Sequence, residues 1–448
     1  MPQNTIKNIV GDMDSVKNTM EMYANGKTNR KIRILSVPSD GSGVGYHRSI
    51  WPHKYIQEHY GDEFDIDIIP MSNWPSDNLK DFFSKYDIVQ MHKQFDDKCE
   101  IITLIKSMGI PVVLDMDDNF KLGNDHPMAI SSQRCGWAGI AVDHLKMADY
   151  VTTTTPIFAK ELRKYNSRVF VLPNAIDEKE RQFSKEKNKS DKIRFGIICG
   201  STHMKDIELM DGIRALPKEI RDKMQIVLCG FDTNGTTTIY NKDTGEVRTR
   251  QLLPHESVWC RYEEFLTDNY RLVNKEHAEF LKGYVKGLDD PFEDDFYRRY
   301  WTKDIHHYAE HYKNVDVLLA PLKENDFNKM KSQLKFVEAG FTDTAVIASN
   351  FGPYTIDGVS YLEKGNKVNE NGNCLLVDTR KNRKQWAKYI KYLVENPDVI
   401  EKMKENLRDE MKEKYSMDKI CKERVELYRK IYFEKQYELK ASKLIKEF

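Results

Sequence analysis

Short apolar runs alternate with longer amphipathic stretches along the first part of the chain. Each run is rich in Val, Ile and Leu, and each is followed by apolar residues at helical spacing. Because the runs are apolar throughout, they predict a parallel sheet that is covered on both faces by helices. The predicted strands are 31–38, 64–70, 86–92, 110–119, 148–155 and 168–174.

The pattern stops in a charged stretch and then starts again. Residues 178–191 (EKERQFSKEKNKSD) have no apolar periodicity, which predicts a linker. A second series of strands follows, and helical patterns dominate from Lys381 to the end. The chain is therefore predicted to be an α/β protein with two doubly wound, Rossmann-like domains. The expected divisions are an extension (1–30), a first domain (31–180), a linker (181–191), a second domain (192–425) and a C-terminal helix (426–448).

Residues 231–300 interrupt the second series. The segment is first polar and rich in Gly and Thr, and then aromatic and charged. It is predicted to be an insertion with a β-hairpin at 238–251, where Thr244 and Gly245 supply the turn. Trp259, Tyr262 and Tyr270 are expected in the core, with an acceptor platform as the alternative.

Composition narrows the class of protein. Charged residues make up 31% and hydrophobic residues 40%, and 70 basic residues balance 70 acidic ones. This balance argues against binding nucleic acid through non-specific phosphate contacts. The seven cysteines form no C-x-x-C pair, which is typical of reduced thiols in a cytoplasmic protein. The sequence predicts neither a secretory signal nor a membrane-spanning helix.

In each predicted domain, the first strand is followed by a loop that contains glycine and serine. In SDGSGVGYHR, Gly43 and Gly45 allow a tight turn and close approach to a ligand, although the pattern is not G-x-G-x-x-G. Arg48 follows near the expected start of a helix. Its side chain could contact either a phosphate or solvent, and the sequence does not decide between the two.

The second of these loops is GSTHMKD, after strand 192–199. Ser201, His203 and Lys205 are its candidate donor-site residues, and we favour a donor-site or capping role for His203 over that of a base. Loops of this kind lie at the carboxyl ends of parallel strands, where ligands of doubly wound folds bind.

The stretch 323–350 is predicted to contain one amphipathic helix. Lys331, Lys335 and Glu338 share a polar face with Ser332 at its edge, opposite an apolar face. Two ammonium groups, a hydroxyl and a carboxylate near a helix start suit a phosphate-bearing nucleotide, with Glu338 on the ribose hydroxyls. A solvated face is the alternative.

The strand at 110–119 ends in an acidic run, DMDDN. Asp115, Asp117 and Asp118 could bind a divalent cation, since oxygen ligands suit one. We favour contacts with substrate hydroxyls or with the protein, and we expect no metal.

Several blocks of the sequence resemble GT-B glycosyltransferases of the family 4-like, retaining type. The blocks cover about residues 30–430. They are NAID (174–177) after VFVLP, the GSTHMKD loop, NKMKSQLKFVEAGFTDTAVIASN (328–350) and NGNCLLVD (371–378).

This resemblance implies two domains that face a cleft, with the acceptor on the first and a nucleotide-sugar donor on the second. The implied reaction moves a sugar from a donor, UDP-sugar first among them, to a hydroxyl with retention of configuration and without a further cofactor. Glu338 would bind ribose, and Lys205, Lys331, Ser332 and Lys335 the diphosphate. Asn350 and Gly352 would lie near the sugar. The acceptor stays open between a glycan, a lipid-linked sugar, a protein and modified nucleic acid, and a homodimer is compatible with the sequence.

The chain departs from the family pattern at two places. Met330 stands where the family has the first of two glutamates, so the contacts with the donor sugar are in doubt. Asp117 is the best match to a histidine near the end of the fourth strand, and His92 is the alternative. These two residues are the catalytic candidates. The second functional hypothesis is an inactive relative that binds a nucleotide or a glycan.

Overall fold

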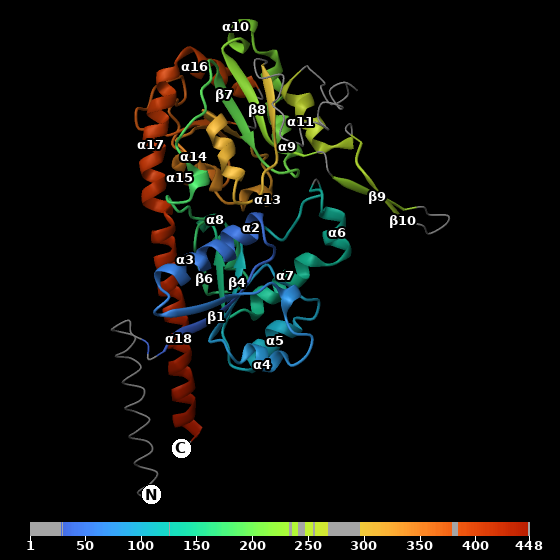
Figure 1. Cartoon of the computed structure of the whole chain (residues 1–448), viewed down its shortest axis with the longest axis vertical. Helices are drawn as coiled ribbons and strands as arrows, with labels where there is room; N and C mark the ends of the chain where they lie inside the picture. The colour runs from blue at the N-terminus through green and yellow to red at the C-terminus, as the bar shows by residue number, and fades with distance from the viewer. Residues whose placement is uncertain are drawn as a thin grey trace, which may run out of the picture. The chain divides into compact units, whose positions relative to one another are not determined.

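The computed structural model describes residue 28 and residues 30–124, 126–232, 235–240, 247–253, 256–267, 296–378 and 384–446. The chain folds into two compact units (Figure 1). The first contains the described residues up to Asp177, residues 330–332 and the chain from Tyr415 onward. The second contains residues 178–329 and 333–414.

The first unit is built on a six-stranded parallel sheet with the strand order β2-β1-β3-β4-β5-β6. All six strands were predicted from their buried apolar residues, which in the edge strand β2 (FDIDI) alternate with aspartates. They are β1 (Ile32–Val37), β2 (Phe64–Ile68), β3 (Ile88–His92), β4 (Val112–Met116), β5 (Tyr150–Thr153) and β6 (Val169–Val171).

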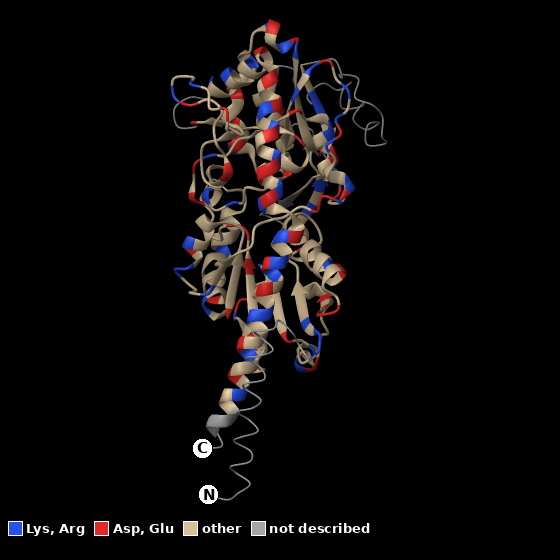
Figure 2. Ribbon diagram, turned by 90° about the vertical axis from the view of Figure 1, so that its left-hand side faces the viewer, with Lys and Arg blue, Asp and Glu red and all other residues tan. Residues whose placement is uncertain are grey.

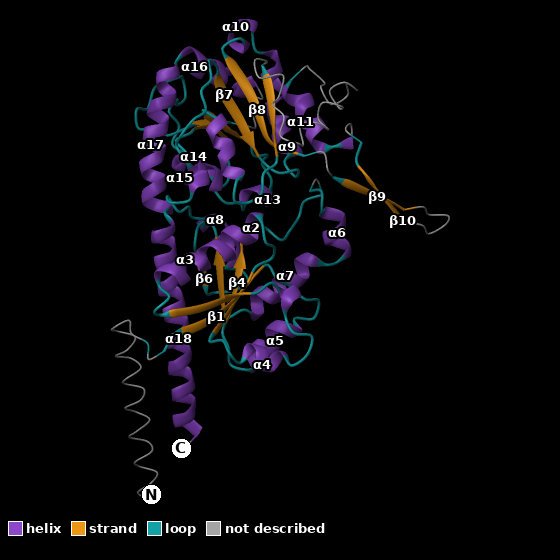
Figure 3. Cartoon of the chain, in the orientation of Figure 1, coloured by secondary structure: helices purple, strands orange, loops and turns teal. Residues whose placement is uncertain are grey.

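Helices cover both faces of this sheet (Figures 1 and 3). One face carries α3 and α18, which pack on each other, while α5 and α7 lie on the other face over a core of aliphatic side chains. The helical elements are α2 (Gly43–Gly45), η1 (Tyr46–Ile50), α3 (Trp51–His59), η2 (Met71–Asn73), α4 (Leu79–Phe83), α5 (Glu100–Ser107), α6 (Ala129–Arg134), α7 (Trp137–Met147), α8 (Pro156–Leu162) and α18 (Met417–Lys446).

The second unit contains another six-stranded parallel sheet, with the order β11-β8-β7-β12-β13-β14. Its strands are β7 (Ile193–Ile198), β8 (Met224–Phe231), β11 (Tyr297–Trp301), β12 (Val317–Ala320), β13 (Ala345–Ser349) and β14 (Leu375–Val377). The edge strand β11 was not predicted, because its sequence YRRYW is not an apolar run. Arg299 is nevertheless buried, since it pairs with Glu263 at 2.7 Å and lies over the ring of Phe231.

Helices surround the second sheet, and among the described ones η3, η4 and η6 are 3₁₀ segments of three, eight and seven residues. They are η3 (Arg181–Phe183), α9 (Met204–Ile207), η4 (Glu208–Ala215), α10 (Lys218–Arg221), α11 (Val258–Leu266), η6 (Tyr308–Asn314), α13 (Asp326–Lys329), α14 (Leu334–Phe341), α15 (Tyr354–Asp357), α16 (Lys384–Glu395) and α17 (Pro397–Tyr415). One apolar core joins η4, α11 and α16 to the strands.

The predicted hairpin of the insertion is present. Strands β9 (Thr236–Tyr240) and β10 (Val247–Gln251) pair antiparallel, and the residues predicted to form the turn lie outside the described residues. Trp259 and Tyr262 lie in the core as expected, whereas Tyr270 is also outside the described residues.

The boundaries of the units differ from the expected ones at two places. The predicted linker 181–191 belongs to the second unit, where Gln182 is buried and donates to the carbonyl of Ile305. The chain returns to the first unit at Tyr415, eleven residues before the expected C-terminal helix at 426. The charged composition of this segment suggested a linker. However, long charged side chains can bury their apolar stems and still place the polar end against a partner.

The charged side chains show no separation by sign on the view in Figure 2, where Lys and Arg alternate with Asp and Glu along α17 and α18. Among the described residues, no helix combines the length and the apolar character that crossing a membrane requires.

Lys187 lies in the predicted linker 181–191 and tests how this segment is bound to the second unit. Its ammonium donates to the carbonyls of Tyr312 and Val315 and to Thr344 Oγ1, at 3.0, 2.9 and 2.7 Å. Burial lowers the pKa of Lys187 to about 7. The unfolded chain, with an ordinary lysine pKa near 10.4, binds one more proton between these values, so stability rises with pH in this window.

We therefore predict that the free energy of unfolding of the wild type, relative to Lys187→Met, rises by up to about 1.4 kcal/mol per pH unit from pH 7 to pH 10. Urea unfolding of both proteins across this range measures the difference. Parallel pH profiles would show that the Lys187 ammonium stays charged in the folded chain.

Candidate functional site

The two catalytic candidates of the first unit form one pair. His92 ends β3 and Asp117 follows β4, and these strands are neighbours in the parallel sheet. Nε2 of His92 lies 3.1 Å from Asp117 Oδ1, and its Nδ1 lies 3.0 Å from Ser39 Oγ. Lys93 completes the group with its Nζ 2.7 Å from Asp117 Oδ1. Asp117 and His92, predicted as alternatives, are thus brought together.

The charges of this group fix its protonation. Burial alone would raise the pKa of Asp117, but Lys93 and His92 outweigh it and hold that pKa well below its usual range. Burial also works to lower the pKa of Lys93, yet Asp117 and Asp118 more than offset it, so this pKa is raised. Asp117 is therefore a carboxylate at neutral pH. It can orient the His92 ring or accept a hydrogen bond from a hydroxyl group. It is a weak base itself.

Lys93 was not among the residues selected from the sequence. Its backbone has a φ of +46°, a left-handed conformation that few residues other than glycine adopt. Such backbone strain is often found at functional sites. The one sequence signal was its place directly after a strand end, where ligands bind in parallel sheets.

Arg48 lies inside the protein and not at a helix start. The helical run begins at Gly43, so Arg48 sits in its second turn with its side chain buried. Its guanidinium donates to both oxygens of Asp115, at 2.9 and 2.7 Å, and also to the carbonyl of Leu172 and to Asn174 Oδ1. This arrangement ties the ends of β4 and β6 together. We therefore leave Arg48 out of the phosphate contacts proposed below.

The two glycines of the first loop have different roles in the backbone. Gly43 has a φ of +45°, which favours glycine at this position. At Gly45, an added Cβ would lie 2.3 Å from the carbonyl oxygen of Asp40, so the loop can close only with glycine.

The Arg48 environment predicts a stability effect. Arg48→Met would leave the Asp115 carboxylate buried without its bidentate partner, which we expect to lower the free energy of unfolding by about 3–5 kcal/mol. Denaturant unfolding measures this. The double variant Arg48→Met with Asp115→Asn should recover part of the loss, because it removes the second charge as well. An unchanged stability of Arg48→Met would instead fit a side chain that serves a bound phosphate.

In the second unit, the loop after β7 contains Ser201, His203 and Lys205. Tyr262 of α11 shapes this loop, since its hydroxyl donates to the carbonyl of Gly200 and accepts from the amide of His203. Ser201 is exposed, and Lys205 is half-exposed with its Nζ 3.0 Å from Glu208. The loop thus presents a hydroxyl and an ammonium group to solvent.

Asp206 holds this loop and was not selected from the sequence. Its buried carboxylate lies 2.7 Å from His203 Nδ1 through Oδ2. Oδ1 accepts from the amide of Lys323, after β12, and from Asn328 Nδ2. One carboxylate therefore joins the loops that follow two neighbouring strands. An aspartate in a short helix carries no sequence signal for such a role.

The prediction of a single amphipathic helix in 323–350 is wrong. The chain forms α13, breaks at residues 330–333 and starts again as α14 at Leu334. Lys331 and Ser332 lie in the break and belong to the first unit, whereas Lys335 and Glu338 belong to the second. They do not share one helix face. Helical periodicity cannot detect such a break, because the residues on both sides keep helical spacing.

Met330 explains part of this break. Its side chain is buried in the core of the first unit. The next polar residue, Ser332, accepts a hydrogen bond at 3.2 Å from Asn174, of the NAID block. The residue at the position of the family's first glutamate is therefore an apolar anchor.

Glu338 is buried and makes strong contacts within the second unit. Its Oε1 accepts from Tyr308 at 2.8 Å, and Oε2 accepts from Tyr312 at 2.7 Å and from Lys335 Nζ at 2.8 Å. Burial and the Glu338 charge together raise the pKa of Tyr312, so this phenol stays a donor. The ribose role of Glu338 remains a prediction. It requires that a ribose hydroxyl join or replace these donors.

The residues predicted near the donor sugar follow β13. Asn350 is exposed, and Gly352 has a φ of +57°. Ser349 Oγ, at the end of the same strand, accepts from the amide of Leu322 after β12. The loops after β7, β12 and β13, three adjacent strands, therefore meet at one edge of the second sheet.

The metal alternative for the acidic run can be judged from its contacts. Asp115 is bound by Arg48, and Asp117 by Lys93 and His92. Within the described part of the chain, no three His, Cys, Asp or Glu side chains are grouped as they would be around a metal ion.

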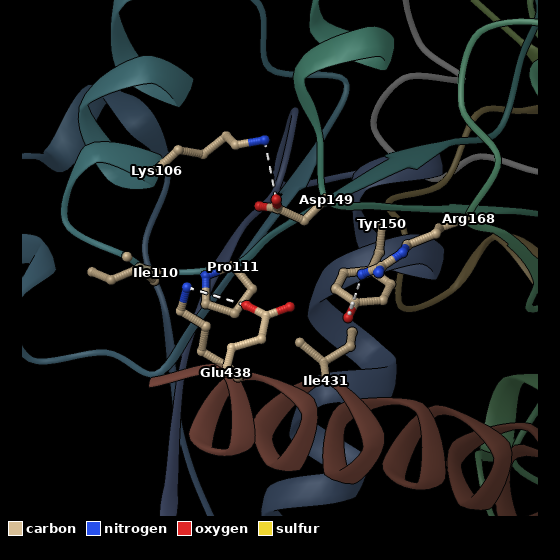
Figure 4. Close-up of a pocket in the computed structure, with 10 residues that line it drawn as sticks. Lys106, Ile110, Pro111, Asp149, Tyr150, Arg168, Ile431 and Glu438 are labelled. Carbon is tan, nitrogen blue, oxygen red and sulfur yellow. Dashed lines mark hydrogen bonds and ion pairs between the residues drawn. The ribbon is translucent and has the colours of Figure 1, made fainter. Parts of the chain in front are cut away.

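A pocket of about 160 Å³ lies elsewhere in the first unit (Figure 4). Its lining includes residues just before β4, β5 and β6, so it lies at the amino ends of these strands. Lys106 pairs with Asp149 at 3.0 Å, and Arg168 donates to Tyr150 (Figure 4). None of the predicted site residues lines this pocket.

Comparison with known proteins shows the fold. No protein-family model and no curated protein sequence matches the chain. Solved structures do match over most of its length. A glycosyltransferase from Rickettsia africae is 13% identical, with 90% of this chain and 99% of that chain covered and a TM-score of 0.55. Sucrose-phosphate synthase from Thermosynechococcus elongatus gives the same identity and coverage, with a TM-score of 0.56.

A third similar structure is the HepE protein of Anabaena in complex with UDP and glucose. It is 11% identical, with 88% of this chain and 98% of that chain covered and a TM-score of 0.52. At these identities the likeness shows the fold alone. The chain therefore has the α/β, GT-B glycosyltransferase fold with a helical C-terminus, as the resemblance in its sequence implied.

Proposed function

We propose that the protein is a glycosyltransferase that moves a sugar from a nucleoside diphosphate sugar to a hydroxyl acceptor. The observation that carries the proposal is the edge of the second sheet at β7, β12 and β13. There, loops with an exposed hydroxyl and ammonium group meet at the carboxyl ends of adjacent strands. This is where doubly wound folds bind their ligands. The fold shared with a UDP-bound protein supports a UDP-sugar as the donor.

The donor would be bound in three parts. Ser201, His203 and Lys205 in the loop after β7 bind the diphosphate, and Lys335 adds positive charge. The diphosphate roles of Lys331 and Ser332, which belong to the first unit, stay predictions from the sequence resemblance. Glu338 binds the ribose hydroxyls, while Asn350 and Gly352 lie at the sugar. Cations and hydroxyl donors stabilise the negative charge that grows on the departing diphosphate.

The acceptor would be handled by the first unit. Its hydroxyl must lose a proton as the new bond forms. His92 is the base, and Asp117 holds its ring, since Nε2 of His92 faces the carboxylate at 3.1 Å. Lys93 keeps Asp117 ionised. In a reaction with retention of configuration, the departing phosphate can share in the deprotonation. The acceptor class is a glycan, a lipid-linked sugar, a protein or modified nucleic acid.

Met330 motivates a second candidate, a nucleotide- or glycan-binding protein without turnover. Its side chain lies in the core of the first unit at the position where a sugar-contacting glutamate is expected. A donor could then bind through its nucleotide without being positioned for transfer. Release of free UDP from a UDP-sugar by the purified protein favours the enzyme, and UDP binding without any turnover favours the binding protein.

Glu338→Gln tests the ribose assignment. Replacement by Ala would leave two phenols and Lys335 without their acceptor, whereas Gln keeps one acceptor oxygen in place of two. We expect Glu338→Gln to remain folded and to lose about 10- to 100-fold in donor kcat/KM, the value of a hydrogen bond to a charged group. UDP-sugar turnover measures this effect. If turnover is not detectable, UDP affinity by calorimetry is the readout.

The matched control is Glu363→Gln, an exposed substitution of the same type in the same unit. It should leave donor use unchanged. If Glu338→Gln retains full donor use and affinity, Glu338 serves only the packing of η6 on α14.

A further inference from the structure

Cys99, His144 and Asp96 form a connected group outside the proposed active site. Cys99 directly precedes α5, Asp96 lies in the loop before it, and His144 is in α7. The Cys99 Sγ is 3.2 Å from His144 Nδ1, and His144 Nε2 is 3.1 Å from Asp96 Oδ1. A thiol, an imidazole and a carboxylate thus stand in the order that activates a nucleophile.

The backbone around Cys99 is specialised. Cys99 has a φ of +54°, which is uncommon for a residue with a side chain and often marks functional sites. It lies at the amino end of the eight-residue helix α5, where the helix dipole favours negative charge on sulfur. Asp96 also accepts from the amide of Glu100 through Oδ2, so the carboxylate is fixed. Cys99 itself is 7% exposed.

The surroundings of His144 can accept a second ring proton. Nδ1 lies 2.9 Å from the carbonyl of Ile140 as well as near the thiol, and Nε2 faces Asp96. When both ring nitrogens are protonated, Nδ1–H has the Ile140 carbonyl and the thiolate as acceptors, and Nε2–H has Asp96 Oδ1. The charged imidazole therefore has an acceptor for each of its two N–H groups, although the amide of Asp96, which donates to Nε2 at 3.3 Å, loses its acceptor when that nitrogen is protonated.

The thiol is protonated at rest. Burial raises the pKa of Cys99, and the carboxylates of Asp96 and Asp143 raise it further. Lys98, Glu100 and Lys146 are the other charged groups nearby in sequence, with Lys98 and Lys146 paired to Glu100 and Asp143 respectively. Sulfur can then attack an electrophile only if a base removes its proton during the attack.

We propose that Cys99 is a modification site for small hydroperoxides, with His144 as the base and Asp96 as the positioning residue. Sulfur attacks one peroxide oxygen, the S–O bond forms and the O–O bond breaks. The thiol proton passes through His144 to the departing oxygen. Hydrogen peroxide thus converts Cys–SH into Cys–SOH and one water. This site is independent of the glycosyltransferase proposal.

The test measures oxidation of the full-length, reduced protein by hydrogen peroxide between pH 6 and pH 9. Sulfenic acid is trapped with dimedone, and each cysteine is quantified by peptide mass spectrometry. The exposed Cys135 in the same sample serves as the internal control. Because His144 and not solvent hydroxide takes the thiol proton, we expect the Cys99 rate to level off within this pH range. An unassisted thiol below its pKa instead gains about tenfold per pH unit, since the thiolate fraction does.

Two variants separate the base from the packing. At pH 7.5 we expect His144→Gln to slow Cys99 oxidation by about 100-fold, the lower end of what a general base contributes. Asp96→Asn keeps an oxygen for the amide of Glu100 and should slow it less. The Cys135 rate should stay the same in both.

Two results would overturn the proposal. One is a wild-type Cys99 rate that keeps rising tenfold per pH unit up to pH 9. The other is oxidation of Cys99 in His144→Gln that is as fast as in the wild type and shows the wild-type pH profile. If this substitution opens the helix pair and speeds oxidation, the wild-type profile alone decides: a plateau supports the base, and a continuous rise refutes it.

Discussion

All strands of a parallel sheet end at the same edge, and this constraint brings together the candidate residues of each unit. Residues that are far apart in sequence become neighbours because the strands before them are adjacent. His92 and Asp117 meet in this way through β3 and β4. The loops after β7 and β12 meet through Asp206, whose Oδ1 accepts from two groups after β12 while its Oδ2 lies 2.7 Å from His203 Nδ1 in the loop after β7. At such an edge, buried carboxylates hold cations or backbone amides in place, and exposed groups remain for a ligand.

The sequence predicted the fold well because parallel strands are buried on both faces. Eleven of the twelve strands in the two large sheets were predicted from their apolar residues, and the hairpin of the insertion was also predicted. β11 was missed because Arg299 is buried by an ion pair with Glu263 and by its place over the ring of Phe231, and these partners are distant in sequence. The predicted linker also has partners that are distant in sequence, since Lys187 donates to three oxygen acceptors of other segments.

The candidate sites were predicted less completely. The pattern placed His92, Asp117 and Glu338 correctly in their elements, but it could not show which carboxylates are held by cations. Arg48 and Lys335 looked alike as phosphate ligands, yet one is fixed to Asp115 and the other to Glu338. Periodicity also joined Lys331 and Ser332 to a helix that starts only at Leu334. Tyr262, Asp206 and Lys93 were missed because their roles depend on contacts with other segments.

The central claim is that the second unit binds a nucleoside diphosphate at the edge formed by β7, β12 and β13. Amide hydrogen exchange with and without saturating UDP tests it most directly, because it reports where the ligand lies without requiring an acceptor. We expect UDP to slow amide exchange in residues 200–206 and 323–338 and to change it little around β2 and α4. Unchanged exchange throughout, or protection only within the first unit, would contradict it.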